Sequence, residues 1–350
     1  MDKQIIELLK RLIATPRISR NETEAADLLQ EQMQEWGLVP QRQGNNLWEI
    51  APGYDAQRPT LLLNAHIDTV KPVNAWTRNP YTPELTEDGV LYGLGSNDDG
   101  ASLVCLLATY CKLRNTQQAY NPIFVASAEE EVSGQNGISS VLPILPPISV
   151  ALVGEPTGMQ PAIAEKGLMV LDCTAKGKAG HAARNEGDNA IDHAIEDIAW
   201  FKSFRFPEES PLLGPVKMTV TIINAGTQHN VIPDTCTFTV DVRSNECYSN
   251  EDIYNKVREN IKSGVKARSF RLNSSRIDRQ HPLLQRALAL GKTPFGSPTL
   301  SDQALMHFPS MKMGPGDSKR SHTADEYIKI SELEDALKTY FEMLNGLVIS

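Results

Sequence analysis

The first apolar pattern along the chain is helical. Between Ile5 and Ile13 apolar side chains recur every three or four positions and predict an amphipathic helix. Pro16 ends this helix, because proline cannot donate a main-chain hydrogen bond. A second helix follows, and Asn21 and Glu24, three positions apart, predict a capping box at its start.

Three short apolar runs have a different character. They lie at residues 61–63, 123–125 and 150–153, and each is too short for a helix and too continuously apolar for a half-exposed strand. Strands of this kind belong to parallel sheets that helices cover. The runs therefore predict the centre of a mostly parallel sheet in an α/β domain.

Ionisable residues follow each of these strands at its carboxyl end. His66 and Asp68 come after the first strand, three glutamates at 129–131 after the second, and Glu155 after the third. In open α/β sheets this edge is where ligands bind. We expect the functional site there.

The section from 167 to 271 follows another pattern. Apolar and polar residues alternate at 217–222 and 235–243, which predicts strands that are covered on one face only. Helical patterns at 190–201 and 253–261 complete the order β-α-β-β-α-β of a ferredoxin-like sandwich. We interpret this section as a smaller α+β domain.

The chain is predicted to end in a helix at 332–344, with Ser331 and Glu334 as its capping box. The whole pattern predicts one α/β domain, with a mostly parallel sheet covered by helices, interrupted by the ferredoxin-like insertion. A length of 350 residues agrees with about two domains. The expected division is 1–162 for the first part of the α/β domain, 163–272 for the insertion and 273–350 for the second part.

Composition narrows the function classes. The chain has 34 Lys and Arg against 43 Asp and Glu, a net charge of -9, which argues against a nucleic-acid partner. No uncharged apolar stretch approaches the roughly 18 residues of a membrane span, and charged residues interrupt the first helix, unlike a signal peptide. The five cysteines are scattered and form no C-x-x-C pair. We expect reduced thiols and a cytoplasmic protein without membrane contact.

Two of the motifs suggest chemistry but have simpler alternatives. His66 and Asp68 lie on the same side of a strand, so the carboxylate can accept a hydrogen bond from the imidazole, as a metal-binding histidine requires. A structural, capping or surface role is the alternative for this pair. Asp98 belongs to the segment 97–100, directly before an apolar helix at 103–113, where simple N-capping is the alternative.

Three further motifs lie at the ends of strands or in turns. Adjacent carboxylates at 129–131 repel one another beside a buried strand, and a metal-bound carboxylate next to a general base would explain them. An exposed acidic patch is the alternative. The segments at 154–157 and 314–316, the second shortly before His322, can each be read as a turn.

Together these five motifs resemble, in order and over nearly the whole chain, the dizinc metallohydrolases that include acetylornithine deacetylase, succinyl-diaminopimelate desuccinylase, aminoacylase and glutamate-releasing carboxypeptidase. The resemblance implies two Zn²⁺ ions per subunit, with Co²⁺ or Mn²⁺ as alternatives. It implies that His66 and Glu155 hold one ion, that Glu131 and His322 hold the other, and that Asp98 bridges them.

The resemblance also implies catalytic roles. Asp68 would orient His66, and Glu130 would be the general base, which takes a proton from the attacking water and returns it to the leaving amine. His181 matches the histidine of the family's lid and dimerisation domain, which reaches the partner subunit's active site and stabilises the oxyanion. A homodimer through the inserted domain is therefore expected. Without the resemblance, a surface role is the alternative for His181.

Three residues are expected to contact the substrate. Asn230 and Arg243 match lid residues that contact the substrate and its α-carboxylate, and arginine is a suitable bidentate partner for that group. For Arg243 the alternative is an ion pair with Asp241 on an outward strand face. Gly316 is expected to contribute from the last turn.

The resemblance implies hydrolysis of the amide bond of an N-acyl amino acid. The leading hypothesis is conversion of N-acetyl-L-ornithine to L-ornithine in arginine biosynthesis, with N-succinyl-L-ornithine as a competing substrate. A cytosolic dipeptidase and succinyl-diaminopimelate desuccinylase are the alternatives within the family. A noncatalytic binding protein of the same fold is the alternative from another class, and the presence of every expected ligand together with Glu130 argues against it.

Overall fold

The computed structural model describes residues 2–184 and 186–349, and the chain divides into two compact units. Unit 1 consists of the residues up to 163, of 276–295 and of the residues from 301 onward. Unit 2 consists of 164–275 and 296–300. The strands β8 (Ala162–Glu165), β15 (Ser275–Arg276) and β16 (Phe295–Ser297) lie where the chain passes between the units.

Unit 1 is built on a sheet whose central strands are parallel. In the order β6–β3–β7–β17, each strand pairs with its neighbour in parallel, and β2 and β1 extend the sheet antiparallel beyond β6. The strands are β1 (Gln41–Gln43), β2 (Asn46–Ile50), β3 (Thr60–His66), β6 (Asn121–Ser127), β7 (Val150–Val153) and β17 (Ser310–Lys312). Every residue of β3, β6 and β7 is buried, which confirms the prediction from the three apolar runs.

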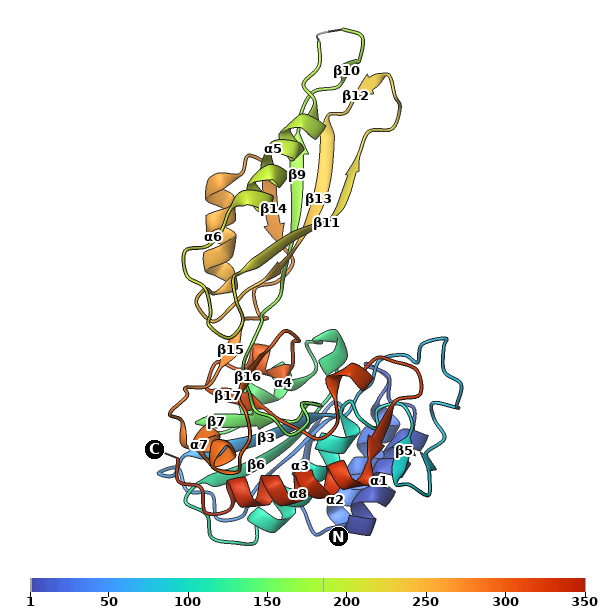
Figure 1. Cartoon of the computed structure of the whole chain (residues 1–350), viewed down its shortest axis with the longest axis vertical. Helices are drawn as coiled ribbons and strands as arrows, with labels where there is room; N and C mark the ends of the chain where they lie inside the picture. Colours follow the sequence, from blue (N-terminus) through green and yellow to red (C-terminus); the bar gives the residue numbers. More distant parts are fainter. Residues whose placement is uncertain (1, 185, 350) are drawn as a thin grey trace. The chain divides into compact units, whose positions relative to one another are not determined.

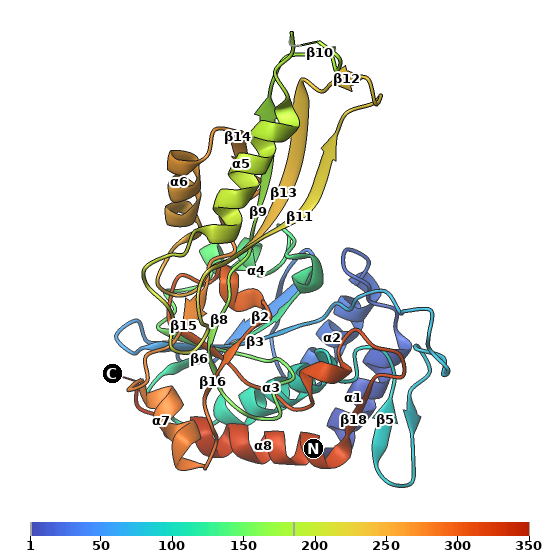
Figure 2. The same ribbon diagram turned by 45° about the horizontal axis from the view of Figure 1, so that its top comes forward.

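Helices cover this sheet. The helix α3 packs on β3 and β6, with α1 and α8 beside it, as Figures 1 and 2 show. The helices of unit 1 are α1 (Asp2–Ala14), α2 (Thr23–Glu35), α3 (Gly100–Leu113), α4 (Ile138–Val141), α7 (Pro282–Ala289) and α8 (Ile330–Leu344). Unit 1 also contains a separate small antiparallel sheet, with the strand order β18 (Tyr327–Lys329), β5 (Val90–Tyr92) and β4 (Glu84–Leu85). The predicted α/β class is confirmed.

Two predicted helix starts are wrong. The second helix begins at Thr23, because the main-chain N–H of Asn21 bonds to Ile18 in a preceding turn, and Asn21 forms no capping box with Glu24. The last helix begins at Ile330 rather than after Ser331. There the Glu332 carboxylate, not Glu334, accepts the N–H of Lys329 at 2.9 Å.

Unit 2 has the predicted order of strands and helices. Its antiparallel sheet follows the order β11–β13–β9–β14, and a short ladder joins β10 and β12. The elements are β9 (Met169–Lys176), β10 (Gly180–His181), α5 (Ala190–Ser203), β11 (Lys217–Ala225), β12 (Val231–Ile232), β13 (Thr235–Arg243), α6 (Asn250–Asn260) and β14 (Gly264–Ala267).

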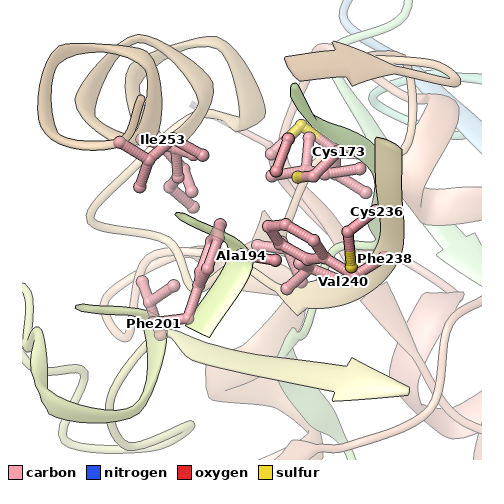
Figure 3. Packing of buried hydrophobic residues seen from close by; sticks show 14 of the residues in the cluster. Cys173, Ala194, Phe201, Cys236, Phe238, Val240 and Ile253 are labelled. Atoms are coloured by element: carbon pink, nitrogen blue, oxygen red, sulfur yellow. The ribbon is translucent and has the colours of Figure 1, made fainter. Parts of the chain in front are cut away.

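The core of unit 2 lies between its sheet and the helices α5 and α6. Figure 3 shows Phe201 and Ala194 of α5 and Ile253 of α6 facing the strand residues Phe238 and Val240. The rings of Phe201 and Phe238 meet edge to face, with centroids 6.2 Å apart. The opposite face of β13 is only partly buried, as the alternating sequence predicts.

Candidate metal centre

The parallel register brings the predicted site residues of unit 1 to one edge of the sheet. His66 is the last residue of β3 and lies opposite Ser127, the last residue of β6. A 3₁₀ turn, η1 (Glu130–Val132), begins three residues beyond Ser127, and Glu155 follows the end of β7 by two residues. Side chains that are far apart in the sequence therefore meet because parallel strands end together.

The carboxylate of Asp98 lies between two histidines. Its Oδ1 is 3.2 Å from Nε2 of His66, and its Oδ2 is 3.7 Å from Nε2 of His322. The same nitrogen of His322 is 2.9 Å from Oε2 of Glu131. One carboxylate with an oxygen toward each histidine has the arrangement needed to bridge two metal ions.

Asp98 precedes α3 without capping it. The N-cap residue is Asp99, whose side chain makes no cap hydrogen bond, and the peptide between Asp98 and Asp99 is cis. The structure therefore contradicts the alternative that Asp98 caps this helix.

Two sets of possible metal ligands share His66. Ligand atoms of His66, Asp98 and Glu131 lie within 4.8 Å of one another, and so do those of His66, Glu130 and Glu155. Together with the contacts of His322, these sets bring all five expected ligands close to one another, and the expected general base Glu130 lies beside them. Oε2 of Glu130 is 3.9 Å from Nε2 of His66.

Asp68 connects the ends of β3 and β6. Nδ1 of His66 is 3.0 Å from the main-chain oxygen of Asp68 and 3.5 Å from its Oδ1. The Asp68 carboxylate accepts hydrogen bonds from the main-chain N–H groups of Glu130 (3.0 Å) and Glu131 (3.2 Å) and from the Ser19 hydroxyl (2.6 Å). Asp68 therefore orients the turn that carries two glutamates as well as the imidazole.

Burial and mutual repulsion govern the protonation of this centre. Burial raises the pKa of Glu130 well above its ordinary value. The positive charge of His66 lowers this pKa in part, and the negative charge of Glu155 raises it further. Burial also raises the pKa values of Glu131 and Glu155, opposed by His322 and by Lys312 respectively. For His66 burial lowers the pKa, but the bonds to Asp68 and the other carboxylates raise it well above its ordinary value overall.

These observations fit two bound cations. Burial and mutual repulsion disfavour the ionised form of these glutamates, and a bound metal ion would offset their negative charge. Imidazole and carboxylate donors together suit Zn²⁺ and related divalent ions. Ions held by these residues would polarise an amide carbonyl and lower the pKa of a bound water, which supplies a nucleophile at neutral pH.

His181 and Asn230, which the resemblance places in a lid, lie in unit 2. His181 and Asn230 are neighbours, since β10 pairs His181 with Val231 and the N–H of Ala182 bonds to the Asn230 oxygen at 3.0 Å. The side chain of His181 is exposed, and its Nδ1 accepts a hydrogen bond from the N–H of Ala183 at 3.1 Å.

The remaining predicted residues have local partners. Arg243, the last residue of β13, donates to both oxygens of Asp241 at 2.9 and 3.1 Å, as the alternative for this residue expects. Gly316 has φ +85°, and a Cβ there would lie 2.2 Å from Oδ1 of Asn97. Only glycine fits this position without displacing Asn97.

Several buried charged residues near the centre are absent from the predicted set. Asp302 accepts a 2.6 Å hydrogen bond from Ser127, and burial raises its pKa to about 6. Lys312 is 2% exposed, and its place in an apolar strand signals a buried charge. Arg17 and Glu326 are also buried. They bind main-chain groups far away in the sequence, and no local pattern indicates such contacts.

A centre of this composition at the carboxyl edge of a parallel sheet is that of a metal-dependent hydrolase. The model of peptidase family M20/M25/M40 matches residues 62–346, so the chain belongs to this family and is a metallohydrolase that acts on amide bonds. The resemblance inferred from the motifs is thereby confirmed.

Similar proteins cover nearly the whole chain. The acetylornithine deacetylase of Proteus mirabilis is 26% identical, over 99% of this chain and 97% of its own length. The succinyl-diaminopimelate desuccinylase 2 of a Ruegeria species is 24% identical, over 96% and 93%. A tripeptidase from Staphylococcus aureus has the same fold, with TM-score 0.75 at 20% identity over 98% of both chains. So does a dinuclear metal-binding peptidase from Bacillus subtilis, with TM-score 0.74 at 18% identity over 98% and 97%.

Proposed function

We propose that the chain is a zinc-dependent deacylase of N-acyl amino acids, with two ions held by His66, Asp98, Glu131, Glu155 and His322. The observation that carries this proposal is the position of the Asp98 carboxylate between two histidines. Co²⁺ and Mn²⁺ suit the same donors, and elemental analysis of the purified protein identifies the bound metal.

Glu130 is the general base of this proposal. The metal ions would activate the attacking water and polarise the amide carbonyl. Glu130 lies at the centre beside His66 and Glu155, with its side chain 11% exposed, and its raised pKa suits a carboxylate that takes up a proton and later returns it to the leaving amine. The bonds of Asp68 to the main chain of Glu130 and Glu131 hold both glutamates in place.

We propose N-acetyl-L-ornithine as the substrate, in arginine biosynthesis, with N-succinyl-L-ornithine as the second candidate. Similarity to the Proteus mirabilis acetylornithine deacetylase over nearly the full length of both chains supports this choice. The test is steady-state hydrolysis of both compounds by zinc-loaded and chelator-treated protein. Metal-dependent turnover of one of them supports the proposal and identifies the acyl group.

Succinyl-diaminopimelate desuccinylase is a second candidate, supported by the Ruegeria relative, and a dipeptidase is a third. N-succinyl-diaminopimelate and a panel of dipeptides belong in the same assay. Failure of both ornithine derivatives, with two metal ions bound and one of these substrates hydrolysed, would contradict the deacetylase proposal and leave the metal centre intact. Absence of any hydrolysis would favour a noncatalytic protein.

We propose that the insertion expected at residues 163–272, nearly all of which belongs to unit 2, is the lid and dimerisation domain. The strand β11 lies at the edge of its sheet and exposes Ile222 and Ile223, each about half, and a second chain would cover such side chains. His181 and Asn230 would then act together on the substrate, and Arg243 would have to leave Asp241 to bind a carboxylate. Sedimentation of the protein tests the dimer, and an Ile222→Glu variant should be monomeric.

We propose the cytoplasm as the location. Cys105, Cys111, Cys173 and Cys236 are free thiols, which suits a reducing compartment. No helix in the described part of the chain is both long and apolar enough to cross a membrane.

A further inference from the structure

The loop that carries Asp98 is held by two buried charged side chains from distant parts of the chain. This loop, residues 93–99, connects β5 to α3 and contains no helix or strand of its own. Arg17 follows α1, and Glu326 precedes β18. Arg17 is 1% exposed and Glu326 is 2% exposed.

Glu326 binds the main chain of this loop. Its Oε1 accepts hydrogen bonds from the N–H groups of Asn97 (2.8 Å) and Asp98 (2.9 Å), and its Oε2 accepts one from Gly95 (3.0 Å). The main-chain oxygen of Glu326 accepts a fourth bond from Gly93. One carboxylate thus holds three main-chain N–H groups of the loop, including that of Asp98 itself.

Arg17 connects the loop to the end of β3. Its Nη2 donates to the Gly95 oxygen at 2.7 Å, and its Nη1 donates to the Ile67 oxygen at 3.0 Å. Ile67 lies between His66 and Asp68. The main-chain oxygen of Arg17 accepts a bond from the N–H of Thr69 at 2.9 Å. The guanidinium therefore spans the gap between the segment of His66 and the loop of Asp98.

We propose that Arg17 and Glu326 are positioning residues, which we call the loop clamp, and that they set the separation of Asp98 from His66 on which binding of two metal ions depends. This inference rests on the proposed metal centre. Neither side chain is one of the ligands. A bridging carboxylate must reach two ions about 3.5 to 4 Å apart, so a small displacement of the loop lowers metal affinity before it alters the fold.

Glu326→Gln tests the loop clamp. The amide is of similar size but presents an N–H₂ group to one or more of the three N–H donors, so the loop must shift. Glu49→Gln is the matched control. Glu49 is a 4% exposed glutamate of β2 in the same unit, which accepts bonds from the Val39 N–H and from Arg114. Both variants lose a buried carboxylate, but only one loses contact with the Asp98 loop.

The measurements are zinc affinity, by competition with a chromophoric chelator, and unfolding of the zinc-free protein. We expect Glu326→Gln to lose about 10- to 100-fold in zinc affinity, and excess zinc to restore part of its turnover. Glu49→Gln should keep the affinity of the unchanged protein, whatever stability it loses.

Equal zinc affinity in Glu326→Gln and Glu49→Gln would overturn the inference. If Glu326→Gln does not fold, the zinc affinity of Arg17→Lys tests the inference instead. Lysine keeps the positive charge, but it lacks the planar guanidinium that donates to the carbonyl oxygens of Ile67 and Gly95 at once. Failure of the unchanged protein to bind two metal ions would instead refute the proposed function. The two failures are therefore distinguishable.

Discussion

Asp99 offers a quantitative test of the electrostatics behind the metal centre. Its side chain is fully buried at the start of α3, and neither carboxylate oxygen has a hydrogen-bond partner among the described residues. Burial raises the pKa of this carboxyl from 3.8 to about 8. In the metal-free protein, Asp99→Asn replaces a proton-binding group by an amide of the same shape.

The sign and size of the effect follow from the pKa. Below about pH 3 the folded and unfolded chains both hold the proton, so the effect of the substitution does not vary with pH there. As the pH rises, the unfolded chain releases the proton while the folded chain keeps it until about pH 8, so Asp99 destabilises the folded state progressively. The slope is about 1.4 kcal/mol per pH unit, so the advantage of the Asn variant grows by about 3 kcal/mol between pH 5 and pH 7.

The assay is urea unfolding of both proteins in the presence of a chelator at pH 5, 6 and 7. Both proteins carry the same other titrating groups, so the change with pH of their difference in unfolding free energy reports position 99 together with its coupling to Asp98 and Glu155. A difference that stays constant with pH, or a variant that becomes less stable relative to the parent as pH rises, would refute the reasoning.

Three other substitutions separate catalysis, metal binding and folding. Glu130→Gln should keep the zinc content and lower turnover by about 10²- to 10⁴-fold in steady-state assays, and undiminished turnover would refute its role as base. Ser19→Ala removes the 2.6 Å bond to Asp68 and should weaken zinc binding about 10-fold by chelator competition, while unchanged affinity would show that the bond is dispensable. Phe238→Ala leaves a cavity in the core of unit 2 and should destabilise this unit by about 3–5 kcal/mol in chemical unfolding, without changing the zinc bound per chain; a loss of zinc would contradict the placement of all the metal ligands in unit 1.

Part of this centre could be predicted from local sequence. Apolar runs reveal buried strands, and in a parallel sheet their ends meet, so His66, Glu130 and Glu155 could be placed at one edge without knowledge of the fold. Asp98 and His322 could not be placed in this way. Loops carry them there, and only the resemblance to a family connects them with His66.

The roles of Arg17 and Glu326 could not be predicted from the sequence, for a different reason. Arg17 and Glu326 act on main-chain groups that lie 50 to 231 residues away, and such contacts leave no periodicity or spacing in the sequence. The failed capping boxes have a related cause. At Asn21 and at Ser331, a neighbouring turn or a competing carboxylate determines where the helix starts, and a propensity rule does not include these neighbours.

The central claim is that Asp98 joins two metal ions, one on the side of His66 and one on the side of His322. The most direct test is the zinc retained per chain after dialysis, measured by mass spectrometry for the unchanged protein and for His322→Gln. Two ions in the unchanged protein and one in the variant are expected. One ion in the unchanged protein, or two held equally tightly by the variant, would contradict the claim.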